Sequence, residues 1–510
     1  MRSSRTYSEA IALLNTCQSN AATIEAIRKS GGRMNDFAIP EMHDYLRRIG
    51  YTPTAEGPEQ VERGACYRYE GQGIYIGFHR EDSPSPSAWK DRFVASYMIQ
   101  TPQDVEVRIG LYTSPHICAV RERIRINGEP LSEEEFAKYF FEVWERLEAD
   151  PKTMTPLTPV FPIYFRLLTL LSFHTFLSLG VEATILEVGI GGTYDSTNIV
   201  PAPVVTGVSS LGIDHTAVLG NTIEEIARNK AGIYKAGVPA LSVRQDYPTG
   251  EAVLAKYAKE IGAEFRVVEN LPADIDLKLG LPGKHQKVNA ALAIELSRVF
   301  LSIHSPSAVP SASSGEIPES FKEPLALTRW PGRCQTIPQP EKNTTWYLDG
   351  AHTVESLKSC GEWIFAGETL PNTLIFNCSG GRSGETLMKA LLESTGEKAE
   401  VVGKRFETVI FCTNVTYSDG GFKGDLASNA IDPNDLAALT TQHALKESWL
   451  SVNPSFDAKH AHVVASIQDA VSIIDELSKR DKVDVLVAGS LHLVGGVMEV
   501  AGLQEGLSMT

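Results

Sequence analysis

The sequence predicts an α/β fold of two domains, each built around a largely parallel sheet. Short apolar runs alternate with helical patterns between about residues 183 and 303, and again between about 345 and 487. Such alternation is typical of parallel α/β sheets. A Ser/Pro-rich stretch at 304–324 separates the two series and has the composition of a linker. We therefore expect domains at 1–303 and 325–510, joined by this linker.

The first domain is expected to open with helices, because apolar residues recur at spacings of three and four through 7–50. Residues 132–148 begin with Ser132, a good N-cap, followed by acidic residues in the first turn, which predicts a helix there. Further along, strands are predicted at 183–188, 204–208 and 241–243, and helices at 222–231 and 250–262.

The second domain is expected to repeat this alternation. Its apolar runs are short and rich in β-branched and aromatic residues, with helical stretches between several of them. Strands are predicted at 345–348, 373–376, 408–411, 463–465 and 483–487.

Composition narrows the functional classes. The chain has 47 basic and 63 acidic residues, a net charge of −16 and a pI of about 5.3. A nucleic-acid or anionic-membrane binder would carry a basic footprint, so neither partner is expected. No apolar run reaches the roughly 18 residues of a membrane span, so no integral membrane segment is expected. The seven scattered cysteines form no C-x-x-C pair, and no targeting peptide is evident, which favours a cytoplasmic protein with reduced thiols.

The chemistry-bearing residues stand where predicted strands end. Glu187 closes an apolar run and is followed by three glycines, and His215 follows the next run. Ligands of open parallel sheets bind at the carboxyl ends of strands. An acid and an imidazole there suit a divalent cation held with nucleotide phosphates. Taken singly, each signal is weak, because such a glycine run is more often a tight turn and a lone histidine is more often structural.

The order of the motifs is more specific than any one of them. Nine occur in succession: Tyr112-Thr-Ser-Pro-His116, Val120-Arg-Glu-Arg-Ile-Arg-Ile-Asn127, Glu187-Val-Gly-Ile-Gly-Gly192, Leu211-Gly-Ile-Asp-His215, Lys230-Ala-Gly-Ile233, His285-Gln-Lys-Val-Asn-Ala290, Trp330-Pro-Gly-Arg333, Leu348-Asp-Gly-Ala-His352 and Gly489-Ser-Leu-His-Leu-Val-Gly-Gly496. Their order and spacing resemble those of folylpolyglutamate synthases, ATP-dependent ligases of the Mur-ligase superfamily.

The resemblance implies a P-loop-type parallel-sheet ATPase domain followed by a smaller Rossmann-like α/β domain, the Mur-ligase architecture. It implies a ligase that joins L-glutamate to the γ-carboxylate of tetrahydrofolate or its polyglutamates. The carboxylate is first activated by ATP as an acyl phosphate, which the glutamate amine then attacks. ATP and Mg²⁺ are the implied cofactors, and a monovalent cation such as K⁺ is compatible. A monomer is expected, and a mitochondrial form is left open.

The resemblance also implies roles for individual residues. On the nucleotide side, it implies that Glu187 and His215 bind the metal, that Lys230 is carbamylated, that Gln286 and Asn289 contact adenine, and that Arg333 and Asp349 contact the nucleotide. On the substrate side, it implies that His352 and Ser490 lie near the incoming glutamate and the acyl phosphate. Tyr164 and Arg166 are implied to lie on the folate side. Simpler readings exist for three of them. Lys230 can be a solvated helix charge, Arg333 a surface loop residue, and Ser490 the end of a strand.

The phosphate loop of this family, V-x-G-T-K-G-K-G-S-T in relatives, has no counterpart in the chain. In its expected place stands Val61–Ile76, inside a segment at 57–108 that has neither the helical nor the strand period. Reading the codons of 61–76 from their second base permits L-N-V-V-H-V-T-G-T-K-G-K-G-S-T. We therefore hypothesise that about 57–108 is a frame-shifted translation, from a sequence error or a genuine lesion.

The hypothesis has a consequence for the chain as written. Without the loop it lacks the backbone that cradles phosphates and the phosphate lysine, and we also expect it to lack a central parallel strand. Impaired ATP binding and ligation are therefore predicted. The alternatives are a catalytically inactive paralogue that binds folate or a protein partner, or a related ligase: a dihydrofolate synthase or an enzyme that adds amino acids to a secondary metabolite.

Overall fold

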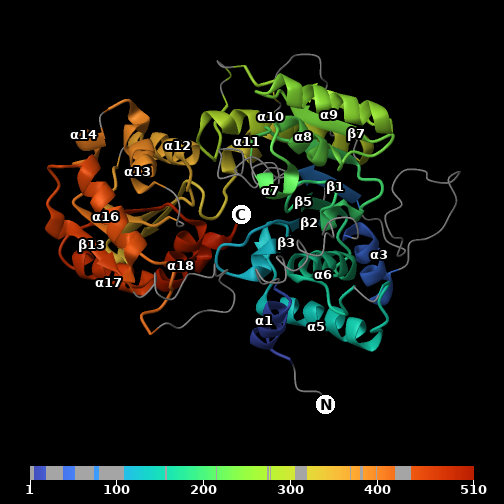
Figure 1. Ribbon diagram of the computed structural model, residues 1–510, viewed down its shortest axis with the longest axis horizontal. Coiled ribbons are helices and arrows are strands. Elements are labelled where there is room, and N and C mark those ends of the chain that lie inside the picture. Colours follow the sequence, from blue (N-terminus) through green and yellow to red (C-terminus); the bar gives the residue numbers. More distant parts are fainter. Residues whose placement is uncertain are drawn as a thin grey trace, which may run out of the picture.

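The computed structural model describes residues 5–18, 38–51, 74–79 (backbone only), 108–155, 158–213, 215–272, 275, 277–304, 317, 319–367, 369–378, 383–397, 399–419 and 438–509. These residues form two lobes that lie side by side (Figure 1). The first lobe contains the strands up to residue 268 and the second lobe those from residue 335.

The sheet of the first lobe has eight strands in the order β4-β3-β2-β5-β1-β6-β7-β8. β1, β2 and β5 to β8 run parallel, while β3 and β4 pair antiparallel at one edge. The strands are β1 (Ile74–His79), β2 (Ile109–Tyr112), β3 (Ile124–Ile126), β4 (Glu129–Pro130), β5 (Ala183–Glu187), β6 (Val205–Val208), β7 (Pro239–Val243) and β8 (Glu264–Val268).

The central strand corrects an expectation from the sequence. We expected the chain as written to lack a central parallel strand, yet β1 occupies that place between β5 and β6. Ile74 pairs with Ala183 and Ile76 with Val205, both in parallel register. The run Ile-Tyr-Ile-Gly-Phe-His is rich in residues that favour strands, which explains how it can fill the position. The rest of the anomalous segment, including 57–73 and 80–107, lies outside the described residues.

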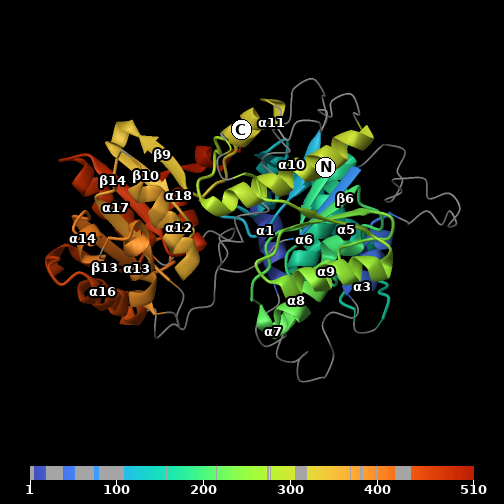
Figure 2. The ribbon, with the colours of Figure 1, turned by 90° about the horizontal axis from the view of Figure 1, so that it is seen from above.

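Helices cover both faces of this sheet (Figure 2). On one face α1 (Tyr7–Thr16), α3 (Ala38–Arg48), α5 (Glu133–Ala149) and α6 (Tyr164–Ser178) pack on Tyr112 and Leu186. The same face continues over α8 (Ile223–Ala231) and α9 (Pro248–Ile261). The opposite face, with Leu111 and Ile185, is covered by α10 (Lys284–His304) and α11 (Glu319–Leu327). Residues 319–324, which we expected in the linker, therefore begin a helix.

The helix expected after Ser132 is confirmed with its cap. Ser132 Oγ accepts a hydrogen bond from Glu135 N at 3.1 Å, and Glu135 Oε2 accepts one from Ser132 N at 3.0 Å. This reciprocal capping box satisfies two backbone groups that the first turn of a helix leaves unpaired. Among the described helices, none is both long and apolar enough to cross a bilayer.

The second lobe has a six-stranded sheet in the order β13-β12-β11-β14-β10-β9, parallel except for β9. Its strands are β9 (Gln335–Gln339), β10 (Thr344–Leu348), β11 (Thr373–Phe376), β12 (Thr408–Cys412), β13 (Ala461–Val464) and β14 (Val483–Ala488). On one face lie α12 (Val354–Phe365), α13 (Gly384–Leu392), α14 (Ala399–Gly403) and α16 (Thr440–Val452); on the other lie α17 (Ile467–Ser478) and α18 (Leu491–Ala501). The five predicted strands are found to within about two residues at each end.

The last described residues return to the first lobe. After α18, Met509 is buried in the apolar cluster that α10 and α11 form with the first sheet. Arg125 of β3 is buried and donates from Nη1 to the carbonyl oxygens of Leu507 at 2.8 Å and Gly128 at 3.0 Å. A buried guanidinium that satisfies a carbonyl in the returning segment fixes that segment against the first sheet.

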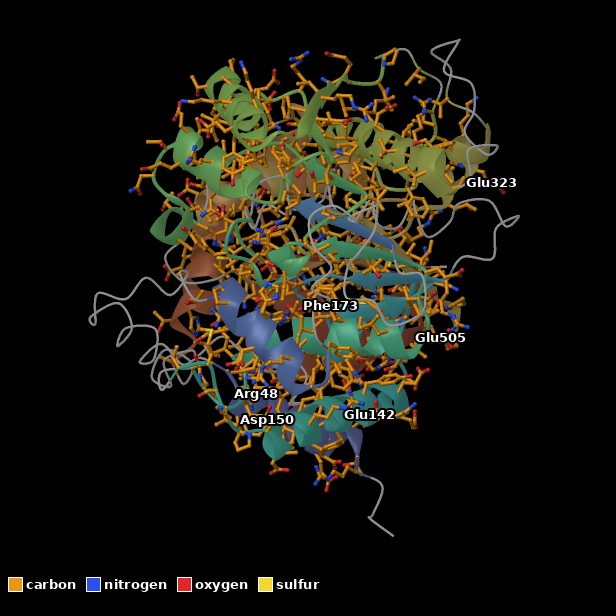
Figure 3. The ribbon with its side chains drawn as sticks, turned by 90° about the vertical axis from the view of Figure 1, so that its right-hand side faces the viewer. Arg48, Glu142, Asp150, Phe173, Glu323 and Glu505 are labelled. Carbon is orange, nitrogen blue, oxygen red and sulfur yellow. The ribbon has the colours of Figure 1, made fainter. Side chains whose placement is uncertain are left out.

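A second buried arginine, Arg48, connects helices α3 and α5 (Figure 3). Arg48 at the end of α3 donates from Nε to Asp150 O at 2.6 Å and from Nη2 to Leu147 O at 2.9 Å. These carbonyls belong to the last turn of α5 and its end, where the helix has no backbone donors of its own to offer. The neighbouring Arg47 instead makes exposed ion pairs with Asp44 and Asp150.

Replacing Arg48 should therefore destabilise the lobe more than replacing Arg47. Arg48→Met leaves two carbonyl groups of α5 without their donor and should lower the free energy of unfolding by about 1–3 kcal/mol. Arg47→Met removes exposed pairs and should cost at most about 1 kcal/mol. Urea unfolding of both variants measures the difference. Equal losses would show that the Arg48 contacts do not stabilise the layer.

Candidate active site

The first part of the site lies where β2 and β5 end. Because these strands are parallel neighbours, their carboxyl ends share one edge of the sheet. Glu187, the last residue of β5, is only 2% exposed. Its Oε2 accepts a hydrogen bond from the backbone N–H of Ser114, in the loop after β2, at 2.7 Å. The loop after β2 thus fixes the orientation of this carboxylate.

The loop after β2 is itself tightly held. Thr113 N donates to Arg123 O at 3.0 Å, and Arg123 Nε donates to His116 Nδ1 at 3.0 Å. The Arg123 guanidinium also lies 5.5 Å from the centre of the Tyr164 ring. Ser114, His116 and Arg123 belong to two of the nine motifs, but the sequence predicted no role for them. The signal that could have identified them is that their motifs, 112–116 and 120–127, lie only a few residues apart.

The three glycines after β5 let other elements approach the turn closely. In the structure, a Cβ at Gly189 would lie 2.6 Å from the Phe165 ring, and one at Gly192 would lie 2.8 Å from Lys230 O. A Cβ at Gly191 would lie 2.5 Å from Asn229 Oδ1. These glycines allow α6 and α8 to pack directly on the turn.

Lys230 lies in the last turn of α8, beside this turn, and is only 1% exposed. The reading of Lys230 as a solvated helix charge is therefore wrong. An ammonium group is rarely buried to this extent unless it is paired or chemically altered. Its position next to the loop that follows Glu187 makes it part of the same strand-end region.

His215 follows β6 and forms the N-cap position of α7 (Thr216–Leu219), with a φ of 47°. It therefore lies at the carboxyl end of the sheet, as Glu187 does, two strands further along the strand order. The described residues contain no cluster of three or more His, Cys, Asp or Glu side chains suited to a metal. A carboxylate and an imidazole at this end of the sheet fit Mg²⁺, which keeps several waters and usually takes few protein ligands together with phosphate oxygens.

Gln286 and Asn289 lie in the first turns of α10, at 1% and 0% exposure. Asn289 Nδ2 donates to Gln286 Oε1 at 2.7 Å. The other polar atom of that amide, Asn289 Oδ1, is buried and accepts no hydrogen bond from the described residues. A buried acceptor of this kind costs free energy unless a ligand or water supplies a donor.

The second part of the site follows β10 in the other lobe. Asp349 is fully buried and accepts hydrogen bonds on Oδ2 from Cys334 N at 3.1 Å and Cys334 Sγ at 3.2 Å. Its Oδ1 accepts from Ala351 N at 2.7 Å. Burial raises the pKa of the Asp349 carboxyl to about 6, although Arg333 and these hydrogen bonds act in the opposite direction.

Arg333 is only 4% exposed, so its reading as a surface loop residue is wrong. A Cβ at Gly350 would lie 2.2 Å from Arg333 Nη1, which places the guanidinium directly against the backbone after Asp349. The absence of a side chain at residue 350 thus makes room for this cation.

His352 and Ser490 lie just after neighbouring parallel strands, β10 and β14. Gly489 N donates to Ala351 O at 2.7 Å, which holds the two strand-end loops together. His352 Nδ1 donates to Gly350 O at 2.6 Å, and the lone pair of the neutral ring is therefore on Nε2. Ser490 Oγ caps α18, accepting from Leu493 N at 3.4 Å. Ser490 thus lies two residues beyond β14 and opens the helix.

Tyr164 and Arg166 open α6. Arg166 forms an ion pair with Glu41 of α3, and both side chains are largely buried. Its charge is therefore already met inside the protein. The structure places Tyr164 beside the loop after β2, through its contact with Arg123. It records no contact of Arg166 with the other predicted site residues.

Comparison with known proteins finds a matching family model and relatives that cover nearly the whole chain. A family model described as the dihydrofolate synthetase C-terminal domain matches residues 333–500. The folylpolyglutamate synthase of Candida albicans is 40% identical over 523 residues, covering 97% of this chain and 96% of that protein. The folylpolyglutamate synthase of Saccharomyces cerevisiae (strain FostersO) is also 40% identical and covers 97% of this chain and 87% of that protein.

Solved structures share the fold. The apo form of L. casei FPGS superposes with a TM-score of 0.65 at 21% identity, covering 98% of this chain and all of the other. E. coli FolC in complex with DHPP and ADP gives 0.62 at 20% identity, covering 98% and 99%. The expected Mur-ligase architecture of two α/β units is thereby confirmed.

The buried Asp349 carboxyl predicts a particular dependence of stability on pH. Its pKa is about 6 in the folded chain and near 3.8 in the unfolded one, so the folded state holds the proton more tightly. The resulting stabilisation is complete below about pH 4 and is lost as the pH rises through 6. The stability of the native chain relative to Asp349→Asn should therefore fall by about 2–3 kcal/mol between pH 4 and 7.

Asp457→Asn is the control for this measurement. Asp457 is exposed, and its hydrogen bond with Lys459 lowers the pKa of the carboxyl. Stability relative to this variant should change in the opposite direction, rising with pH. Denaturant titrations of all three chains across this range measure the slopes. A flat difference for Asp349→Asn would mean that the carboxyl is ionised throughout.

Proposed function

The chain belongs to the folylpolyglutamate synthase family, and from this premise we propose that it is a tetrahydrofolate:L-glutamate γ-ligase that forms ADP. In this reaction the γ-carboxylate of tetrahydrofolate, or of its growing glutamate tail, takes the γ-phosphoryl group of ATP to give an acyl phosphate. The amine of L-glutamate then attacks the acyl carbon and releases phosphate.

One observation carries the proposal. Glu187, Lys230, Arg333 and Asp349 are ionisable, stand at or near strand ends, and are each at most 4% exposed. Buried charges rarely repay their desolvation through stability alone. Their concentration at the strand ends of both sheets is typical of a functional site. Ligation of two anionic substrates with a triphosphate requires such a set of charges.

The nucleotide is proposed to lie between α10 and the start of the second lobe. The unsatisfied acceptor Asn289 Oδ1 suits the amino group of adenine, and Gln286 holds that amide in place. Arg333 would meet phosphate oxygens, and Asp349 would accept hydrogen bonds from the nucleotide. Support comes from relatives whose structures contain ADP and AMPPCP.

Glu187 and His215 are proposed to hold Mg²⁺. Bound there, Mg²⁺ would neutralise charge on the phosphate oxygens. The loop after β2 would keep the Glu187 carboxylate oriented through the Ser114 N–H. A monovalent cation such as K⁺ is compatible with this arrangement.

The acyl-transfer side of the site is proposed to lie at the ends of β10 and β14. His352 would orient the incoming glutamate through Nε2, because Nδ1 is committed to Gly350 O. Ser490 stands at the N-terminus of α18, where backbone N–H groups favour an anion. Tyr164 and Arg166 are proposed to border the folate. Within this family we also propose a monomer in the cytoplasm, with a mitochondrial form left open.

The missing phosphate loop is proposed to limit the ligase activity of the chain as written. The place that the motif order predicts for the loop, Val61–Ile76, contains no lysine. At the carboxyl end of β1, the place that the strand order indicates, the chain continues His79-Arg-Glu-Asp82. This string has no glycine and no lysine, so it cannot supply the backbone and the cation that phosphates need. We propose that the chain as written ligates poorly and that the frame-shifted string restores activity.

A ligation assay tests both proposals. The chain as written is compared with one in which 61–76 is replaced by the frame-shifted string. With ATP, Mg²⁺, L-glutamate and tetrahydrofolate, the replaced chain should form the diglutamate at a rate at least about a hundredfold higher, as expected for groups that bind transferring phosphate. Full activity of the original chain would contradict the role assigned to the loop.

The matched control carries the same string with alanine in place of its second lysine. It should return the rate to that of the chain as written, because the two strings differ only at this lysine. Sequencing of genomic DNA and transcripts across these codons tests the frame shift itself.

A second candidate, dihydrofolate synthase, is favoured by the description of the family model that matches the second lobe. A further arm of the assay replaces tetrahydrofolate with dihydropteroate. Product from dihydropteroate, and none from tetrahydrofolate, would decide for the second candidate.

Lys230 provides a further prediction. If it is carbamylated, Lys230→Met in the loop-restored chain should lower the ligation rate at least about a hundredfold, because the added carboxylate is lost. Lys259→Met, on the exposed side of α9, is the control and should leave the rate unchanged. Nuclear magnetic resonance with ¹³C-bicarbonate should show a carbamate signal that the Lys230 variant lacks. A signal retained in that variant would assign the carbamate to another lysine.

A further inference from the structure

Glu122 is a buried acid that the proposed reaction does not use. It is 3% exposed and accepts three backbone hydrogen bonds: Oε2 from Ile117 N at 3.1 Å, and Oε1 from Cys118 N at 2.8 Å and Ala119 N at 2.6 Å. Bonds from N–H groups to a buried carboxylate are stronger than those between neutral groups. Glu122 therefore fixes the backbone of residues 117–119.

The upstream end of this loop reaches the first part of the site. Ser114 N donates to Glu187 Oε2, and only two residues separate Ser114 from Ile117. Thr113 N and the His116 ring are both held by Arg123, which directly follows Glu122 in the chain. Any shift of residues 117–119 must therefore be absorbed within a very short stretch of chain that ends at Glu187.

The downstream end of the loop is embedded in the second lobe. Ile117 and Cys118 belong to the apolar core formed by β10, β14, α17 and α18. Cys118 Sγ donates to Gly495 O of α18 at 3.3 Å. A Cβ at Gly495 would lie 2.2 Å from Ile117 O, so the helix and the loop backbone are in direct contact.

We propose that Glu122 is a positioning residue that couples the second lobe to the Glu187 carboxylate. Glu122 holds residues 117–119 rigid. These residues pack against α18, and the chain just before them carries the Ser114 N–H that donates to Glu187. A movement of α18 is thereby transmitted to the proposed metal ligand. The coupling depends on the proposed function only for the role of Glu187.

Hydrogen exchange of the full chain tests the connection without relying on ligation. Glu122→Gln replaces one acceptor oxygen with an amide NH₂ that cannot accept. The amides of Ile117, Cys118 and Ala119 should exchange at least about tenfold faster, as expected when bonds to a charged acceptor are lost. Unchanged exchange at these amides would overturn the positioning role. Glu135→Gln makes the same chemical change in the exposed capping box of α5 and should leave them unchanged.

A substitution in the second lobe tests the transmission itself. Gly495→Ala places a methyl group against the Ile117 carbonyl, although alanine is the better helix former. Exchange of the Ser114 amide, in the other lobe, should become at least about threefold faster. Gly496→Ala is the matched control on the next residue of α18, because its Cβ would meet the flexible end of the Ile467 side chain instead.

The outcomes separate coupling from local stabilisation. Faster exchange at Ser114 in Gly495→Ala, but not in Gly496→Ala, supports the proposal. Exchange at Ser114 that is unchanged in a folded Gly495→Ala chain overturns it. If Gly495→Ala does not fold, Ile117→Ala tests the connection from the loop side, because it removes the Ile117 side chain from the core of the second lobe. Unchanged Ser114 exchange in that variant overturns the proposal. These results stand whether or not the chain ligates glutamate, so they fail independently of the proposed reaction.

Discussion

The parallel direction of neighbouring strands is the constraint on which both halves of the site depend. In the first lobe it brings the ends of β2 and β5 to one edge, so that Ser114 and Glu187, 73 positions apart, meet at 2.7 Å. In the second lobe it does the same for β10 and β14, whose loops join through Gly489 and Ala351. Backbone geometry thus assembles the polar groups before any ligand is present.

The strands and helix starts that were predicted correctly are those with a signal in a short stretch of sequence. Buried parallel strands such as 183–187 and 408–412 are buried at every position and consist mostly of apolar residues. Ser132 with Glu135 marks a helix start within four residues. Strands β8 and β9 were not predicted, because they are half-exposed strands at or next to sheet edges and carry polar residues. The central place of Ile74–His79 was missed for another reason. It depends on two partner strands more than 100 positions away in sequence.

The sequence was sufficient to predict which residues belong to the site, but not which residues they contact. Motif order identified Lys230, Arg333 and Asp349, and all three side chains are buried. Asp349 directly follows β10, whereas Lys230 lies in the last turn of α8 and Arg333 precedes β9. Their surroundings depend on tertiary packing, which no spacing in the sequence encodes. The pairing of Arg166 with Glu41 and the packing of α8 on Gly192 are two such cases. Both change the interpretation of residues whose type alone suggested a ligand contact.

The return of Met509 to the first lobe means that the polypeptide crosses between the lobes twice, once near Trp330 and once near Leu507. Pulling the lobes apart would extract Met509 from its apolar cluster and break the bond from Arg125 to Leu507. It would also withdraw Ile117 and Cys118 from the core of the second lobe. The two chain crossings and this packed loop therefore resist separation of the lobes at three places.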